Sequence, residues 1–306
     1  MSGYLLVRGV AAIILLMVIM SGTFILTRSI GDPVRLLLPP DASSEQIASF
    51  RAQLGLNRPL WEQLGDFLSH AMRGDFGESI WQRRGTLEIV AGRLLPTLML
   101  AASALLTAVF IGVPLGTAAA AMRNSWIDKA ITLLSLSFIS IPYFWLGLLL
   151  ILLFPVTLGI LRTGGYGSWE HFVLPTITGA ALPAGRIAQV TRSTLLDVLT
   201  QDYIMTARAK GLTEQAILFR HALPNAALPI ITMAGWDLAR LLGGGLVIVE
   251  TIFSWPGLGR LTFQAIERHD FPLIQTAIFV QASMVIALNF IIDVAYTLID
   301  PRVRIR

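Results

Sequence analysis

Two carboxylates, Asp237 and Asp293, fall inside long apolar stretches of the sequence. Paired carboxylates can share acid and base work, so a membrane-embedded protease is the first enzymatic hypothesis. Their depths differ by about 10 Å at 1.5 Å per residue, because Asp237 is near the middle of its stretch and Asp293 is near the end of another. Asp237 also follows Trp236 and lacks the Gly-x-Gly context of such a protease. The sequence therefore does not favour catalysis at this pair.

The sequence also lacks the motifs for nucleotide or metal chemistry. A phosphate-binding loop of an ATPase ends in Gly-Lys-Ser/Thr, but the only lysines, Lys129 and Lys210, follow Asp128 and Ala209. ATP that drives this protein must therefore bind another polypeptide, and we predict that the chain is not an enzyme. The four histidines are scattered, without a His-Glu-x-x-His pairing: His70, His171, His221 and His269. We assign no metal ligands.

Ionisable side chains inside apolar stretches are costly unless they are paired or wetted. Asp237 and Arg240 are three residues apart, so they can pair on one helix face. They either form an internal ion pair or border a water-filled substrate path, and the sequence favours neither alternative. Arg186, in the preceding apolar stretch, is a third candidate for the path, with no partner evident from the sequence.

The composition is that of a polytopic membrane protein. Of 306 residues, 55% are hydrophobic and only 14% are charged, and the mean hydropathy is +0.70. Without cysteine the chain has no disulfide framework and no Cys-based metal or nucleophile site. The net charge of +4 is spread along the chain, which argues against a nucleic-acid face.

Six apolar stretches are long enough to cross the bilayer as helices, which predicts an all-α membrane protein. They lie near 8–28, 94–121, 130–158, 172–195, 225–249 and 273–298. The first could be a signal peptide, but no small-x-small cleavage site follows it, so we expect a retained anchor. Prolines and glycines interrupt the stretches, either for ordinary close packing or because irregular backbone lines a cavity.

Basic residues in the short loops set the orientation. One side of the membrane carries Arg8, Arg123, Lys129, Arg192, Arg208, Lys210, Arg220, Arg302, Arg304 and Arg306, and the other carries Arg162, Arg260 and Arg268. The richer side is expected to be the cytoplasm. Both termini then lie inside, and the long segment 29–93 lies outside.

The segment 29–93 is predicted to be helical. Ser43 can cap a helix with Gln46 completing a capping box, and the apolar stripe that follows ends at Gly55. A second helix is expected from about Pro59 to Gly74. This segment either packs as a cap on the membrane domain or helps to receive a binding protein.

A polar segment, Asp202 to Pro224, separates two apolar stretches and has helical periodicity. Tyr203, Ile204 and Ala207 share one side of a first helix in the sequence pattern. Gly211 can end that helix in a left-handed turn, Thr213 can cap a second helix, and Pro224 is expected to stop it. A helix pair between membrane spans usually has a partner.

Several motifs, in order along nearly the whole chain, resemble the permease subunits of dipeptide, oligopeptide and nickel ABC importers. They are LGLNRPL at 54–60, GDFGES at 74–79, GYG at 165–167, LP at 174–175, Gly211 followed by HALP at 221–224, GGG at 243–245, ETIFSWPGLGR at 250–260 and DPR at 300–302. The ordered set is far more specific than any single motif.

The resemblance implies a type I importer membrane domain at 94–298, preceded by an extra helix at 1–28 and the external segment 29–93, and followed by a cytoplasmic tail at 299–306. It also implies a second homologous permease, two ATPase subunits that bind ATP and Mg, and an external solute-binding protein. Residues 200–224, here called the coupling segment, would contact the ATPase through Tyr203, Ala207, Lys210, Gly211, Leu212, His221, Leu223 and Pro224. Met205-Thr206-Ala207 stands where the wider superfamily has Glu-Ala-Ala, which puts the glutamate contact in doubt.

The resemblance therefore predicts alternating access, in which ATP-driven closure of the ATPases moves the coupling segment and the spans reorient a central cavity in a bacterial inner membrane. The substrate is expected to be a di- or oligopeptide, with nickel or another small solute as the alternative, because the same motifs accompany both. An ATP-independent secondary transporter is the alternative class, which inverted repeats would favour, and we find no convincing internal repeat.

Overall fold

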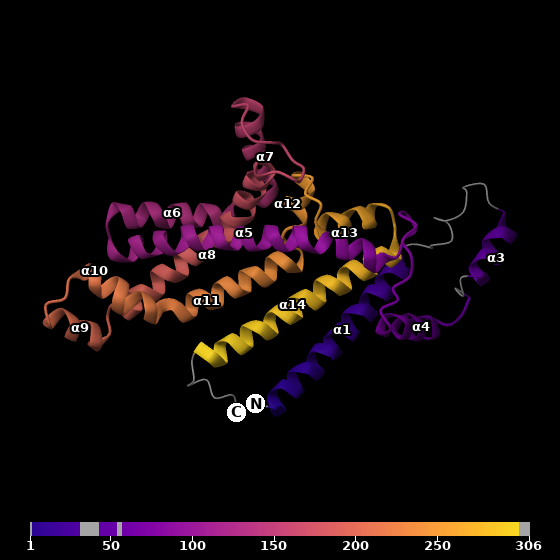
Figure 1. The fold of residues 1–306 in the computed structure, drawn as a ribbon, viewed down its shortest axis with the longest axis horizontal. Helices are drawn as coiled ribbons and strands as arrows, with labels where there is room; N and C mark the ends of the chain where they lie inside the picture. Colours follow the sequence, from indigo (N-terminus) through magenta and orange to yellow (C-terminus); the bar gives the residue numbers. More distant parts are fainter. Residues whose placement is uncertain (1, 31–42, 54–56, 300–306) are drawn as a thin grey trace. The chain divides into compact units, whose positions relative to one another are not determined.

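The computed structural model describes residues 2–30, 43–53 and 57–299, and these are almost entirely helical (Figure 1). In these ranges the only β pairing is an isolated bridge between Glu78 and Gly85. The predicted all-α class is therefore confirmed. The DPR motif, the tail beyond residue 299 and the predicted helix end at Gly55 lie outside the described residues.

The chain divides into two compact units. The first comprises the described residues of Met1–Thr97 and Pro256–Phe290, and the second those of Leu98–Trp255 and Ile291–Arg304. The helices of the first unit are α1 (Ser2–Ile30), α3 (Ser44–Gln53), α4 (Leu60–Met72), the start of α5 (Thr86–Ala121), α13 (Leu258–Glu267) and most of α14 (Phe271–Ile299). Those of the second are the rest of α5, α6 (Trp126–Ser140), α7 (Tyr143–Ile151), η1 (Leu152–Thr157), α8 (Trp169–Val198), α9 (Asp202–Ala209), α10 (Glu214–Ala216), η2 (Ile217–Ala222), α11 (Leu223–Arg240), η3 (Leu241–Gly245) and α12 (Val247–Ile252).

Four helical stretches are long and apolar enough to cross a membrane: Val7–Arg28, Thr86–Ala121, Glu214–Gly245 and Phe271–Asp293. The bent pair α6 and α7 with η1 would make a fifth. All six predicted stretches coincide with helices, but α8, which holds the fourth, does not meet the same apolar test among the described residues. The count of six spans therefore stays a prediction.

The predicted span 130–158 is not one straight helix. Its axis bends by 101° between α6 and α7. Ile141 is extended, with ψ 122°, and Pro142 precedes the first residue of α7. A residue before proline is pushed out of the helical region, so the break falls where sterics demand it. The proline interruption expected in this stretch is therefore present as a sharp bend at Pro142.

Helix α8 is the centre of the second unit, and α6 and α11 run along it (Figure 1). Glycines bring its neighbours close. A Cβ added at Gly116 of α5 would lie 2.4 Å from the carbonyl oxygen of Ala188, and one added at Gly185 of α8 would lie 2.5 Å from that of Ser135 in α6. Small residues allow such backbone approach in membrane helices. At these positions the glycines serve close packing.

Two of the sequence motifs meet in the second unit. The backbone N–H of Gly165 donates to the carbonyl oxygen of Phe253 at 2.8 Å, and the ring of Tyr166 stands edge-on to that of Trp255. Trp255 is fully buried and also meets Phe172 edge-on. Edge-to-face aromatic contacts add to the hydrophobic gain of burial. The GYG motif and the centre of ETIFSWPGLGR therefore pack against each other.

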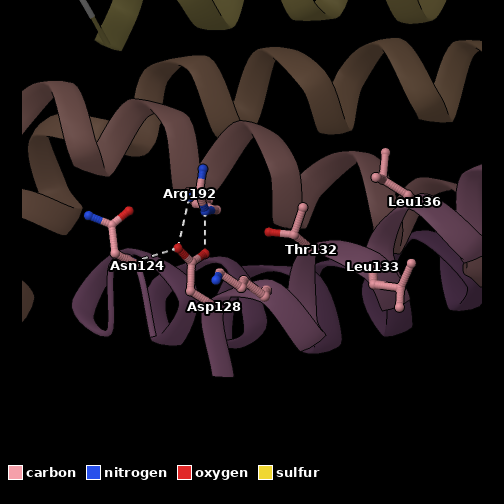
Figure 2. Close-up of a pocket in the computed structure, with 7 residues that line it drawn as sticks. Asn124, Asp128, Thr132, Leu133, Leu136 and Arg192 are labelled. Atoms are coloured by element: carbon pink, nitrogen blue, oxygen red, sulfur yellow. Dashed lines mark hydrogen bonds and ion pairs between the residues drawn. The ribbon is translucent and has the colours of Figure 1, made fainter. Parts of the chain in front are cut away.

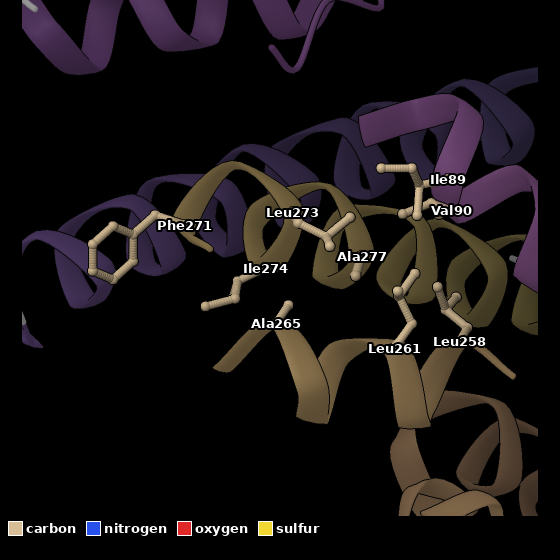
Figure 3. Packing of buried hydrophobic residues seen from close by; sticks show 9 residues of the cluster. All are labelled: Ile89, Val90, Leu258, Leu261, Ala265, Phe271, Leu273, Ile274 and Ala277. Carbon is tan, nitrogen blue, oxygen red and sulfur yellow. The ribbon is translucent and has the colours of Figure 1, made fainter. Parts of the chain in front are cut away.

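The core of the first unit lies where α5, α13 and α14 meet (Figure 3). Its buried side chains are Ile89, Val90, Leu258, Leu261, Ala265, Phe271, Leu273, Ile274 and Ala277. Beside it the buried carboxylate of Asp270 accepts hydrogen bonds from the Ser79 hydroxyl and from the backbone N–H groups of Trp81 and Leu273. These contacts fasten the loop before α5 to the start of α14.

The helices predicted in segment 29–93 are present as α3 and α4. Ser43 and Gln46 form the reciprocal capping box, with N–H to side-chain oxygen distances of 2.9 and 3.2 Å. Helix α4 begins after Pro59, and Gly74, just beyond its end, has φ +79°. Both predicted helix starts are confirmed.

Candidate functional site

The coupling segment forms two short helices, α9 and α10, at the tip of the second unit (Figure 1). Gly211 has φ +79°, so it ends α9 in the left-handed region that disfavours side chains with a Cβ. The Thr213 hydroxyl accepts a hydrogen bond from the N–H of Ala216 at 3.3 Å and caps α10. The predicted helix-turn-helix is confirmed.

An apolar cluster of its own holds the pair together. Ile204, Ala207 and Ile217 are buried against one another, with Leu199 and Leu212 packed at the edge. Ala207 and Leu212, predicted as contacts to an ATPase, therefore support the helix pair from inside. Of the stripe predicted from the sequence, Ile204 and Ala207 form the buried face of α9, whereas Tyr203 is exposed.

An ion pair joins the two helices across the turn. The Arg208 guanidinium donates to both oxygens of Glu214, at 2.8 and 3.2 Å. These hydrogen bonds raise the pKa of Arg208 above its usual value, so the side chain stays a cation. The pair is exposed, so it contributes at most about 1 kcal/mol to stability.

The coupling segment also exposes three large apolar side chains. Tyr203 is 44% exposed, and Met205 and Phe219 are each 60% exposed. Lys210 and Gly211 are exposed at the turn between them. Tyr203, Lys210 and Gly211 were predicted as contacts, whereas Met205 and Phe219 were not. Their signal in the sequence is an apolar residue amid polar ones, but only the fold shows that they stay uncovered.

Pro224 does not stop the second helix. The backbone stays helical from Glu214 to Arg240, through the π-helical turn η2 and into α11. Pro224 is the second residue of α11, directly after η2. The π-helical turn interrupts the α-helical hydrogen bonding, which restarts in α11, so Pro224 stands in a first turn where its missing N–H is tolerated. His221 and Leu223 consequently lie within this continuous helix, where the His221 carbonyl accepts from the Asn225 amide at 2.6 Å.

A pocket of about 410 Å³ lies behind the coupling segment, where the ends of α5 and α8 face α10. Its polar lining includes Arg123, Thr200, Arg208, Glu214 and Gln215. The coupling segment thus lies beside the ends of two helices that pack on each other.

Inside the membrane domain, Asp237 pairs with Arg186 and not with Arg240. The Arg186 guanidinium donates to Oδ1 of Asp237 at 3.0 Å, which joins α8 to α11. Asp237 is 1% exposed and Arg186 21%. The sequence allowed a pair between Asp237 and Arg240, whereas the ion pair in the structure joins Asp237 to a residue 51 positions away on a packed helix.

Two further groups surround this ion pair. Arg240 and Tyr143 both interact electrostatically with Asp237, and Tyr143 does so with both arginines. Oδ2 of Asp237 is buried without a hydrogen-bond partner among the described residues. The three predicted path residues thus lie in one charged cluster, at the start of α7 and between α8 and α11.

A second ion pair between spans escaped the sequence analysis. Arg192 of α8 donates from Nε and Nη2 to the two carboxylate oxygens of Asp128, at 2.6 and 2.9 Å (Figure 2). Asp128 also accepts from the backbone N–H of Asn124. This bidentate pair ties α6 to α8 beside an open pocket of about 390 Å³. Its partners are 64 residues apart, so no local pattern links them.

No group of three or more His, Cys, Asp or Glu side chains that could hold a metal ion occurs in the described part of the chain.

Comparison with known proteins agrees with this geometry. Residues 112–305 match the model of the family described as binding-protein-dependent transport system inner membrane component, and residues 1–85 match that of its N-terminal part. The chain belongs to this permease family. As a permease of an ABC importer it is an integral inner-membrane subunit and not an enzyme, and it works with a separate ATPase and a substrate-binding protein. The ATP-independent alternative is set aside.

Relatives of this permease cover nearly its whole length. It is 41% identical over 305 residues to the glutathione transport system permease protein GsiC of Salmonella choleraesuis (strain SC-B67), covering 99% of both chains. It is 43% identical over 274 residues to GsiC of Escherichia coli (strain K12), covering 90% of this chain and 89% of the relative.

A solved structure confirms the fold of the permease. A chain of the MetNI methionine ABC transporter in an inward-facing conformation superposes with a TM-score of 0.61 at 20% identity. The match covers 69% of this permease and 96% of that chain. The predicted ABC importer membrane domain is confirmed.

Proposed function

We propose that this permease forms half of the translocation path of a peptide importer, with a second homologous permease as the other half. Two ATPase subunits, which bind ATP and Mg, drive it from the cytoplasm, and an external binding protein delivers the substrate. Both termini are cytoplasmic in this proposal. The boundaries are 1–28 for the first span, 29–93 for the external segment, 94–298 for the core and 299–306 for the tail.

The observation that carries the proposal is the set of large apolar side chains that the coupling segment exposes. Tyr203, Met205 and Phe219 are exposed on a helix pair that already has its own buried cluster. Large apolar side chains that stay exposed on a folded element are typical of a protein interface. We therefore place the ATPase contact on these three side chains, together with Lys210 and Gly211 at the turn.

His221, Leu223 and Pro224 lie on the continuous helix of the coupling segment, and we propose that they relay its movement. Inside the membrane domain, we propose that Arg186, Asp237 and Arg240 border the substrate path. The ion pair between Arg186 and Asp237 supports this placement, because it joins two helices at the depth where a path must pass.

The substrate class rests on the named relatives, which are glutathione transport permeases. Glutathione is a small peptide, so a peptide is the favoured substrate of this chain, with nickel or another small solute as the alternative. Uptake of labelled glutathione and of Ni²⁺ into proteoliposomes that hold the whole complex decides between them. ATP-dependent uptake of Ni²⁺ without uptake of glutathione or other peptides would refute the peptide assignment.

The chain lacks cysteine, so single cysteines can test the ATPase contact without background. We expect Met205→Cys and Phe219→Cys to cross-link to the ATPase subunit in membranes. Ile204→Cys is the matched control, because its side chain is on the same helix pair but fully buried. Cross-linking at Met205→Cys no stronger than at Ile204→Cys would contradict the proposed contact.

A further inference from the structure

The charged cluster between α8 and α11 is not neutral. Asp237 supplies one negative charge, and Arg186 already balances it in an ion pair at 3.0 Å. Arg240, three residues further along α11, adds a positive charge that makes no hydrogen bond or ion pair with another described residue. The cluster as a whole therefore carries one excess positive charge.

Arg240 is on an uncovered face of α11. Its side chain is exposed, and so is that of Trp236 four residues earlier, which is 70% exposed and therefore lies on the same side of the helix. Asp237 is on the buried side, against α8. Arg240 is thus at the edge of this packed face, with its side chain exposed.

An arginine within an apolar span is costly against lipid, so it faces water or a counter-anion. The backbone on both sides of the cluster supports a solvated surrounding. The chain breaks at Ile141–Pro142, directly before Tyr143, and η3 follows Arg240 with Gly244 at φ +116°. Irregular backbone at membrane depth occurs where it is buried in protein or lines a cavity.

We propose that Arg240 binds the C-terminal carboxylate of the passing substrate, so that the path selects anionic peptides. This inference rests on the proposed peptide function and specifies its substrate class. A guanidinium forms charge-assisted, often bidentate hydrogen bonds with a carboxylate. The same excess positive charge raises the barrier for hydrated divalent cations, which argues against nickel as the cargo. Arg186 and Asp237 hold α11 in register and fix the place of Arg240.

The test uses the complete complex in proteoliposomes, with binding protein and ATP. Two probes differ in one carboxylate: glutathione, and its monoethyl ester at the glycine carboxylate. Uptake by Arg240→Gln is divided by uptake by the unmodified complex for each probe, so that the preference of the binding protein cancels. Lys129→Gln is the matched control, since it removes one exposed positive charge from α6 in the same unit.

We expect Arg240→Gln to lower glutathione uptake roughly tenfold, the equivalent of one charge-assisted hydrogen bond, and ester uptake less than twofold. Arg240→Lys should retain most glutathione uptake, and Lys129→Gln should leave both probes unchanged. Equal loss of both probes, with or without loss of the assembled complex, would mean that Arg240 binds another subunit and would overturn the inference. Unchanged uptake of both would overturn it as well. If the unmodified complex takes up neither probe nor any other peptide, the peptide function itself fails.

Discussion

The carboxylate of Asp237 has two oxygens in different situations. Oδ1 accepts from Arg186, while Oδ2 is buried without a hydrogen-bond partner among the described residues. A buried polar atom without a hydrogen-bond partner costs free energy. The packing of the surrounding helices must therefore offset the cost of burying Oδ2. A small shift of α11 could supply a second donor, and Arg240 and Tyr143 are the nearby candidates.

We predict that Asp237→Asn destabilises the permease by about 2–4 kcal/mol, because it leaves the charge of Arg186 unbalanced between helices. The partial exposure of Arg186 keeps the loss near the lower end of this range. The double change Arg186→Gln with Asp237→Asn should cost less than the sum of the two single changes. Thermal unfolding of the four purified forms gives the coupling energy, and strictly additive losses would show that the pair does not stabilise the fold.

At the scale of the helix, the packing of α8 depends on a glycine in the neighbouring helix α5, which has no Cβ. Gly116 lets α5 approach so closely that a Cβ would lie 2.4 Å from the carbonyl oxygen of Ala188 and 2.6 Å from Cβ of Thr191. Both contacts are with parts of α8 that cannot rotate away. Gly116 has only a hydrogen atom in place of a Cβ, and this permits the short separation of α5 and α8.

We predict that Gly116→Ala lowers the free energy of unfolding by about 1–3 kcal/mol through overpacking, although alanine is the better helix former. The matched control is Gly92→Ala in the same helix, where no atom lies within 4 Å of the added Cβ. That change should be neutral or stabilise by up to about 1 kcal/mol. Similar melting temperatures for the two variants would contradict the close packing of α5 on α8.

At the scale of the whole molecule, the two units contain segments that we expect on opposite sides of the membrane. Helix α4, in the first unit, belongs to the segment predicted outside, and the start of α6 in the second unit belongs to the side predicted inside. Glu62 and Lys129 are exposed representatives of these two segments.

We predict that an impermeant maleimide added to intact cells labels Glu62→Cys but not Lys129→Cys, and that both react after permeabilisation. The native chain has no cysteine that could react in their place. Labelling is scored by the mass shift of the purified permease. Reaction of Lys129→Cys in intact cells would reverse the proposed orientation.

Local features of the fold could be predicted because they depend on neighbours in sequence. The capping box of Ser43 and Gln46, the turn at Gly211 and the cap at Thr213 each involve residues within a few positions of one another. The sequence pattern alone can predict these interactions, because the residues that form them lie within one helical turn of one another.

Contacts between residues that are far apart in sequence were not predicted. Arg186 with Asp237 and Asp128 with Arg192 join residues more than 50 positions apart, so periodicity carries no information about them. Pro224 was misjudged because its effect depends on its place within the first turn of a helix. The interruption at Pro142 was predicted, but the size of the bend, 101°, was not, because it depends on how α6 and α7 pack.

The helical run from Glu214 to Arg240, which passes through η2 and Pro229, has a mechanical consequence. Asp237 stands about 35 Å from its first residue. If this run tilts as one unit, a rotation of about 10° at Glu214 displaces Asp237 by about 6 Å. That distance exceeds the reach of a hydrogen bond, so a modest swing at one end suffices to exchange the partners of a carboxylate at the other.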